Sequence, residues 1–186
     1  VATAEANGLQ GYWRHALVKA VAAREIAERL WKQPGDEAFI AGLLHDLGML
    51  VLMQELGASY CQFVDQVRQS DSELAALEQE SLGFDHFQLG ARLLDEWGLP
   101  ESIVQAVGTR PERATIAALP PGRQSLAQIL HLAELLARML ILERPGTLTR
   151  LLECGEAYGR LTVSSLDALV AALDEKVPTL AEILAL

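Results

Sequence analysis

The chain has 186 residues, a formal net charge of −10 and an apolar fraction of 51%. This length fits one domain, or one domain with an appendage, and the apolar fraction is enough for a sizeable core. The acidic charge and the lack of a long Lys/Arg run argue against the basic surface that binding to nucleic acid or to an anionic membrane needs, so we expect neither partner. Aromatic residues are only 5%, while alanine and leucine dominate, which favours helices over strands.

Cysteine use and apolar patterning favour a cytoplasmic location. Cys61 and Cys154 form no CxxC pair and no zinc-like cluster, which is typical of reduced thiols in the cytosol. The opening Val-Ala-Thr-Ala-Glu does not resemble a signal peptide. The longest apolar stretch, residues 38–53, contains His45 and Asp46, so we interpret it as a core helix rather than a membrane span.

Apolar residues recur at helical spacing, and the alternation typical of strands is absent. We therefore predict an all-α helical bundle. The segment 36–56 is apolar nearly all round and is placed at its centre. The predicted helices cover residues 9–32, 36–56, 57–69, 71–82, 86–97, 100–107 and 124–142, followed by three short helices between 147 and 186.

Residues that favour caps and breaks set the expected ends of these helices. Two capping-box patterns, Ser70 with Glu73 and Asp85 with Gln88, start the helices at residues 71 and 86. The proline-rich residues 109–123 are predicted to form the main loop, and Arg144-Pro145-Gly146 a second break. In the tail, Ser164 is expected to cap one helix and Pro178 to open the last.

The pair His45-Asp46 is the most informative feature of the sequence, because it lies inside an almost wholly apolar segment. A buried carboxylate needs a metal ion, an arginine or lysine, or several hydrogen bonds to satisfy it. Imidazole and carboxylate are suitable ligands for Zn, Mn or Fe, but the spacing alone favours a satisfied polar pair between helices. Gly42 and Gly48 flank the pair and indicate close packing of another element there.

Several separated motifs resemble the HD-related output domain (HDOD) family. They are Tyr-Trp-Arg-His at 12–15, Ala-Phe-Ile-Ala-Gly-Leu-Leu-His-Asp-Leu-Gly at 38–48, Glu-Ser-Leu-Gly-Phe-Asp-His at 80–86, Trp-Gly-Leu-Pro at 97–100, Leu-His-Leu-Ala-Glu-Leu-Leu-Ala at 130–137 and the tail around 161–184. The resemblance covers most of the chain. The wider HD superfamily consists of helical, metal-dependent phosphohydrolases.

The resemblance implies a candidate metal site. Ligands in the superfamily follow the order His, then His-Asp, then a distant Asp, and the matching positions are His15, His45, Asp46 and Glu134. Glutamate stands where the superfamily has aspartate; it can still ligate, but it shifts the metal or the helix. An ion pair with Arg138, four residues along, is the other explanation of Glu134.

The related HD-GYP proteins, which are cyclic-di-GMP phosphodiesterases, have further ligands. His86 matches one of these and is a further metal candidate, or else a residue that only lies near a helix start. A His-His pair is expected where this chain has Val-Gly-Thr-Arg-Pro at 107–111, and the Gly-Tyr-Pro signature is missing. A centre of two or three metals is therefore expected to be broken, leaving no cofactor or a single, weakly bound divalent ion (Mn, Fe or Zn).

The resemblance implies a bacterial signal-transduction module without catalytic activity, which acts through signalling protein partners or by sensing a ligand. A metal-dependent phosphohydrolase is the alternative, since His15, His45 and Asp46 are retained. A nucleotide is a candidate ligand, with Arg110, Arg113 and Arg123 either holding its phosphate or lying in a solvated loop. The oligomeric state stays open.

The expected organisation is an HDOD-like helical domain at residues 1–143 and a helical extension at 144–186 packed on it. HDOD proteins usually carry a further helical segment upstream of the Trp-x-x-His stretch, whereas a dozen residues precede it here. The chain is accordingly interpreted as a fragment or a shortened member of the family.

Overall fold

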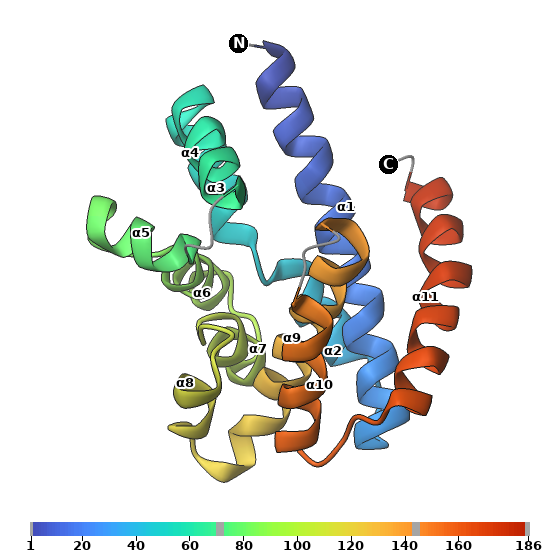
Figure 1. Ribbon diagram of the computed structural model, residues 1–186. Coiled ribbons are helices and arrows are strands. Elements are labelled where there is room, and N and C mark those ends of the chain that lie inside the picture. Colours follow the sequence, from blue (N-terminus) through green and yellow to red (C-terminus); the bar gives the residue numbers. More distant parts are fainter. Residues whose placement is uncertain (1, 70–72, 143–145, 185–186) are drawn as a thin grey trace.

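The computed structural model describes residues 2–69, 73–142 and 146–184, and every regular element in these ranges is a helix (Figure 1), which confirms the all-α prediction. In chain order the helices are α1 (Ala2–Ile26), a π-helical turn (Ala27–Trp31), α2 (Asp36–Leu44), α3 (Leu47–Leu56), α4 (Ala58–Gln69), α5 (Leu74–Leu82), α6 (His86–Glu96), α7 (Glu101–Val107), α8 (Arg113–Ala117), a 3-10 turn (Pro121–Arg123), α9 (Gln124–Leu142), α10 (Thr147–Ala157) and α11 (Val163–Leu184).

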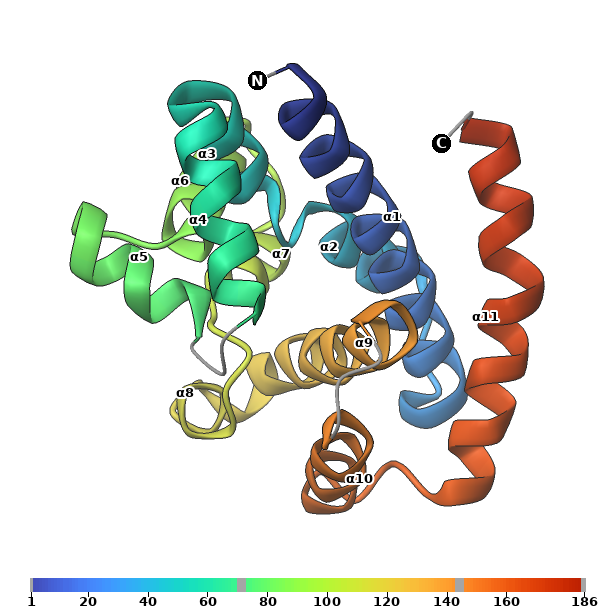
Figure 2. The ribbon, with the colours of Figure 1, turned by 45° about the horizontal axis from the view of Figure 1, so that its top comes forward.

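Helix α1 is the centre of the fold. All residues from 16 to 27 except Arg24 are buried, and the helix packs against α2, α9 and α11. Figures 1 and 2 both show α11 on one side of α1 and the group α3–α6 on the other. The prediction that segment 36–56 holds the centre is therefore wrong. Small side chains give α1 this position, because they let neighbouring helices approach closely: a Cβ on Gly42 would lie 3.0 Å from the Cα of Ala20.

Apolar side chains form two cores that share α1. The larger one joins α1 with α2, α7, α9, α10 and α11, and it includes Ile26, Leu132 and Leu173. The smaller one joins the N-terminal part of α1 with α3 and α4, through Tyr12 and Met49 among others. The candidate site lies where these two cores meet.

The predicted helix at 36–56 is two helices, because the chain turns at His45 and Asp46. Asp46 has φ −104° and ψ 19° and directly precedes α3. By length and composition this is the one described stretch that could cross a bilayer, but half of its most apolar window is buried inside the protein. That burial and the break favour its interpretation as core.

Glycines at two close approaches confirm the predicted tight packing around the His-Asp pair. Gly42 of α2 packs against α1, and Gly48 of α3 lies directly against the first residue of α6. A Cβ on Gly48 would be 2.8 Å from the carbonyl carbon of His86 and 2.9 Å from its Cα, and closer still to its oxygen. Real Cβ atoms essentially never come this near to backbone, so only glycine fits.

Gly48→Ala is expected to destabilise the fold by about 1–3 kcal/mol, because the new methyl group forces α3 and α6 apart. Urea unfolding followed by circular dichroism measures the loss. Gly122→Ala is the matched control, since a Cβ there meets no atom within 4 Å, and it should change stability by less than about 0.5 kcal/mol. Equal unfolding midpoints for the two variants would contradict the close approach.

The tail differs from the prediction. Its described part, residues 146–184, holds two helices instead of three, and Pro178 lies inside α11 instead of opening a helix. Pro178 is exposed, and the packing of Leu169 and Leu173 on the core carries the helix through the lost hydrogen bond. The predicted cap at Ser164 is also wrong, since the Thr162 Oγ1 accepts from the backbone N–H of Ser165 at 3.3 Å.

Elsewhere, the expected helix boundaries are partly confirmed. The capping box of Asp85 with Gln88 is present, and α9 has the predicted bounds. The 109–123 segment is not only a loop, because α8 and the 3-10 turn lie within it. Helix α5 begins at Leu74, after an extended Glu73, while Ser70 with residues 71–72 and most of the break at 144–146 lie outside the described residues.

Candidate functional site

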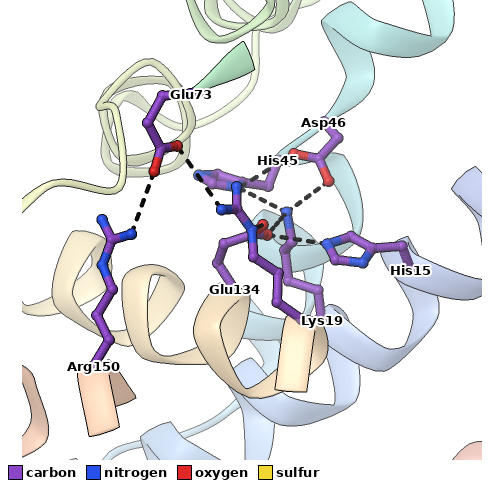
Figure 3. Close-up of polar contacts among 8 residues, drawn as sticks. His15, Lys19, His45, Asp46, Glu73, Glu134 and Arg150 are labelled. Atoms are coloured by element: carbon purple, nitrogen blue, oxygen red, sulfur yellow. Dashed lines mark hydrogen bonds and ion pairs between the residues drawn. The ribbon is translucent and has the colours of Figure 1, made fainter. Parts of the chain in front are cut away.

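An ammonium group lies where α1, the turn between α2 and α3, and α9 meet. Lys19, from α1, is 0% exposed. Its Nζ donates to Asp46 Oδ2 at 2.6 Å and to His45 Nδ1 at 3.1 Å, and it pairs with Glu134 Oε2. Figure 3 shows the Nζ between these three side chains, so each of its three protons has an acceptor.

Charge balance explains how this ionic cluster is tolerated in the core. Burial alone would lower the pKa of Lys19, but the carboxylates of Asp46 and Glu134 outweigh it and raise that pKa. Burial alone would raise the pKa of Asp46, yet the Lys19 ammonium holds it well below its usual range. The pKa of Glu134 is lowered in the same way by Lys19 and Arg138. All of these groups are therefore charged at neutral pH.

The two histidines predicted as ligands face this cluster from opposite sides (Figure 3). Burial and the adjacent Lys19 lower the pKa of His45, so the ring is neutral and its Nδ1 accepts the lysine proton. The His45 Nε2 then carries a proton, and it is buried without a hydrogen-bond partner. His15 lies at the other side, with its Nε2 3.1 Å from Glu134 Oε2. Because a carboxylate only accepts, this Nε2 is the donor.

A chain of ion pairs extends from Glu134 to the surface. Its Oε1 accepts from Arg138 Nε at 2.5 Å, which confirms the predicted ion pair four residues along α9. Arg138 also lies 3.8 Å from Glu73, which in turn bonds Arg150 of α10 at 3.3 Å. Lys19 and Arg138 thus balance the two carboxylates of the cluster.

His86 is held in a separate polar pair. It is the first residue of α6, after the capping Asp85, and its Nδ1 lies 2.5 Å from Glu78 Oε2 of α5. The backbone N–H of His86 donates to the same oxygen at 2.9 Å, and the Tyr60 hydroxyl donates to the other oxygen of Glu78. Glu78 is 0% exposed. This fixes the ring of His86, with its Nε2 directed away from Glu78.

A resident metal ion does not fit this arrangement. Donor atoms of His15, Asp46 and Glu134 lie within 4.8 Å of one another, which is close enough for a metal site. The Lys19 ammonium is bonded to both carboxylates, however, and neutralises the charge that would attract an ion. A divalent ion about 4 Å from this charge would be repelled by roughly 8 kcal/mol at an effective dielectric of about 20. The ammonium therefore supplies the positive charge of this site.

The arginines considered as phosphate ligands are mostly engaged. Arg110 bonds Asp85 through its Nε at 2.5 Å. Arg123 pairs with Glu101 at 2.6 Å. Arg113 is exposed at the start of α8.

Sequence reasoning missed two residues of this region, Lys19 and Glu78. Lys19 follows His15 by four residues, so both lie on one face of α1, and this spacing was a usable signal. An arginine or lysine was among the expected partners of Asp46, although no residue was named. Nothing in the sequence pairs Glu78 with His86, because that contact depends on how α5 and α6 pack.

A match to a protein family agrees with the all-helical fold of this chain. The HDOD domain family matches residues 2–112, which is more than half of the chain. The chain therefore belongs to the HDOD family. No curated protein is a match.

Solved structures with this fold have varied descriptions. One, a candidate phosphohydrolase from Shewanella amazonensis SB2B, has a TM-score of 0.67 at 20% identity over 89% of this chain and 59% of its own. The MmoQ response regulator from Methylococcus capsulatus str. Bath has a TM-score of 0.61 at 30% identity, over 87% and 61%. An HDOD domain protein of unknown function from Geobacter sulfurreducens has a TM-score of 0.55 at 20% identity, over 88% and 61%. The chain thus spans about three fifths of each of these proteins.

Proposed function

We propose that this HDOD chain is a signalling output module without catalytic activity, which works in the cytoplasm through protein partners. The position of Lys19 carries the proposal. A metal-dependent phosphohydrolase needs a Lewis acid with open coordination positions, and it must activate water. An ammonium group with three bonded partners has neither property. Its role here is to hold α1, α3 and α9 together.

Two further observations support a module of this kind. The residues at 107–111 are Val-Gly-Thr-Arg-Pro, without the histidines that a second metal would use, and Arg110 is bonded to Asp85. A response regulator is among the proteins with a similar fold. Trp97, at the end of α6, is 60% exposed, and tryptophan is enriched at protein–protein interfaces. The net charge of −10 makes a nucleic acid an unsuitable partner.

The metal-dependent phosphohydrolase is the second candidate, because His15, Asp46 and Glu134 do come together. Lys19 separates the two candidates. In an enzyme, the metal would have to displace a buried ammonium whose pKa is raised, whereas an output module needs no such exchange.

Protein purified without added metal is expected to contain no stoichiometric Mn, Fe or Zn, because the Lys19 ammonium already neutralises the carboxylates. It is also expected not to hydrolyse cyclic-di-GMP or bis(p-nitrophenyl) phosphate when Mn or Fe is supplied. Elemental analysis and product detection by chromatography measure the two outcomes. Turnover that disappears in Asp46→Asn would contradict the proposal, since a contaminating hydrolase would be insensitive to that change.

A further inference from the structure

A pocket of about 160 Å³ adjoins the lysine cluster. Its walls come from α1, α3, α4, α5, α6 and α9, helices that are distant in the sequence. Most of the wall is apolar, including Met49, Val64, Leu74, Ala75 and Phe87. Asp46, Glu134 and Arg138 are polar members of the lining. The pocket therefore lies beside the cluster that the proposed function treats as structural.

Two polar side chains in this lining are buried but have no partner for their outer atoms. Tyr12 and His86 are each 4% exposed. Among the described residues, no group bonds the Tyr12 hydroxyl, and none bonds the Nε2 of His86, whose Nδ1 is held by Glu78. Burial and the charge of Asp46 raise the pKa of Tyr12, so its hydroxyl keeps its proton. Both atoms are thus available to bond a molecule in the pocket.

The chemistry of the lining limits what that molecule is. Arg110 and Arg138 are each bonded to a carboxylate, at 2.5 Å in both cases, so the charge of each guanidinium is already balanced within the protein. Glu73 and Glu112 add negative charge to the lining, and this disfavours an anion. A cavity of about 150 Å³ holds a molecule of the size of benzene, whereas pockets for larger ligands have about 300–1,000 Å³.

We propose that this pocket binds a small uncharged aromatic molecule with one hydrogen-bonding group, of the phenol class. The ring packs against Met49, Val64 and Phe87. The hydroxyl donates to the His86 Nε2 and accepts from the Tyr12 hydroxyl. The inference rests on the proposed function, because it assigns to the site a sensing role in place of a metal reaction.

Binding of phenol to the full chain, measured by saturation-transfer NMR and calorimetry, tests the inference. Phenol is expected to bind. Benzene, which has the same ring without the hydroxyl, should bind about tenfold more weakly, roughly the contribution of one hydrogen bond. The anion benzoate should also bind about tenfold more weakly, because Glu73 and Glu112 give the lining negative charge. Tyr12→Phe should weaken phenol by about the same factor and leave benzene unchanged. This variant removes only an atom without a protein partner, so the fold should not suffer.

Ala75→Leu fills the pocket and is expected to abolish binding of phenol and of benzene. Ala76→Leu is the matched control, because Ala76 is the next residue of α5 and is exposed. Absence of phenol binding would overturn the inference, and binding unaffected by Ala75→Leu would overturn it too, because phenol would then bind outside this pocket. Cyclic-di-GMP binding that is lost in Ala75→Leu would overturn the inference in favour of an anionic ligand. These outcomes are independent of metal content and turnover, which test the proposed function.

Discussion

Lys19→Met is expected to lower the free energy of unfolding by about 3–5 kcal/mol, because it removes one partner from a buried ionic cluster. Methionine keeps most of the volume, so the loss comes from charge and hydrogen bonding. Asp46 loses a partner at 2.6 Å, and His45 Nδ1 loses its donor. Urea unfolding followed by circular dichroism measures the change. At this chain length it corresponds to a fall in melting temperature of roughly 6–20 °C.

The double variant Lys19→Met with Asp46→Asn is the control for charge. It removes one cation and one anion, and the pair of Glu134 with Arg138 stays balanced. The double variant is expected to be more stable than Lys19→Met alone, since no buried carboxylate is left uncompensated. If the single variant does not fold, a double variant that does fold supports the same conclusion, that an uncompensated Asp46 carboxylate causes the loss. If the double variant loses as much free energy of unfolding as the Lys19→Met and Asp46→Asn single variants together, the two residues are not coupled.

Local patterns account for the part of the fold that the sequence predicts. Helical spacing of apolar residues places the helices, because each must bury one face. Asp85 and Gln88 form the expected capping box, since both partners lie within one turn. Gly42 and Gly48 indicate the close helix contacts correctly, because a glycine inside a helix costs stability unless it permits an approach.

Tertiary packing decides the features that the sequence does not predict. The break at His45-Asp46 interrupts a pattern that reads as one continuous helix, and it arises because both side chains bond to Lys19 of another helix. Pro178 remains inside α11, since packing against the core outweighs one lost hydrogen bond. The central place of α1 depends on its small side chains, whose effect is visible only once α2 and α9 lie against them.

The candidate site shows the same division. Motif resemblance brings together His15, Asp46 and Glu134, and the structure places their donor atoms within 4.8 Å. A motif match does not reveal Lys19, because this residue lies between the candidate ligands and is not itself a ligand. Because Lys19 pairs with both carboxylates, the group is an ion-pair cluster in the structure. His15, Asp46 and Glu134 nevertheless lie together, as the resemblance implies.

Lys19→Ala is expected to make the stability of the chain depend on divalent metal. With the ammonium removed, the lone pairs of Asp46 Oδ2 and Glu134 Oε2 become available beside His15, and the truncated side chain leaves space for an ion. An ion that binds only the folded state stabilises it by about 2.7 kcal/mol when present at ~100 times its dissociation constant. The melting temperature of Lys19→Ala should therefore rise by roughly 5–11 °C with Zn or Mn.

Wild-type protein measured at the same metal concentrations is the control, and its melting temperature should not change, because Lys19 occupies the site. Lys19→Ala with His15→Ala should lose most of the rescue, since one of three ligands is gone. An equal rise in the wild type and in Lys19→Ala would mean that metal binds elsewhere or displaces the ammonium. The block by Lys19 would then be refuted, and with it the main argument against a metal-dependent reaction in this chain.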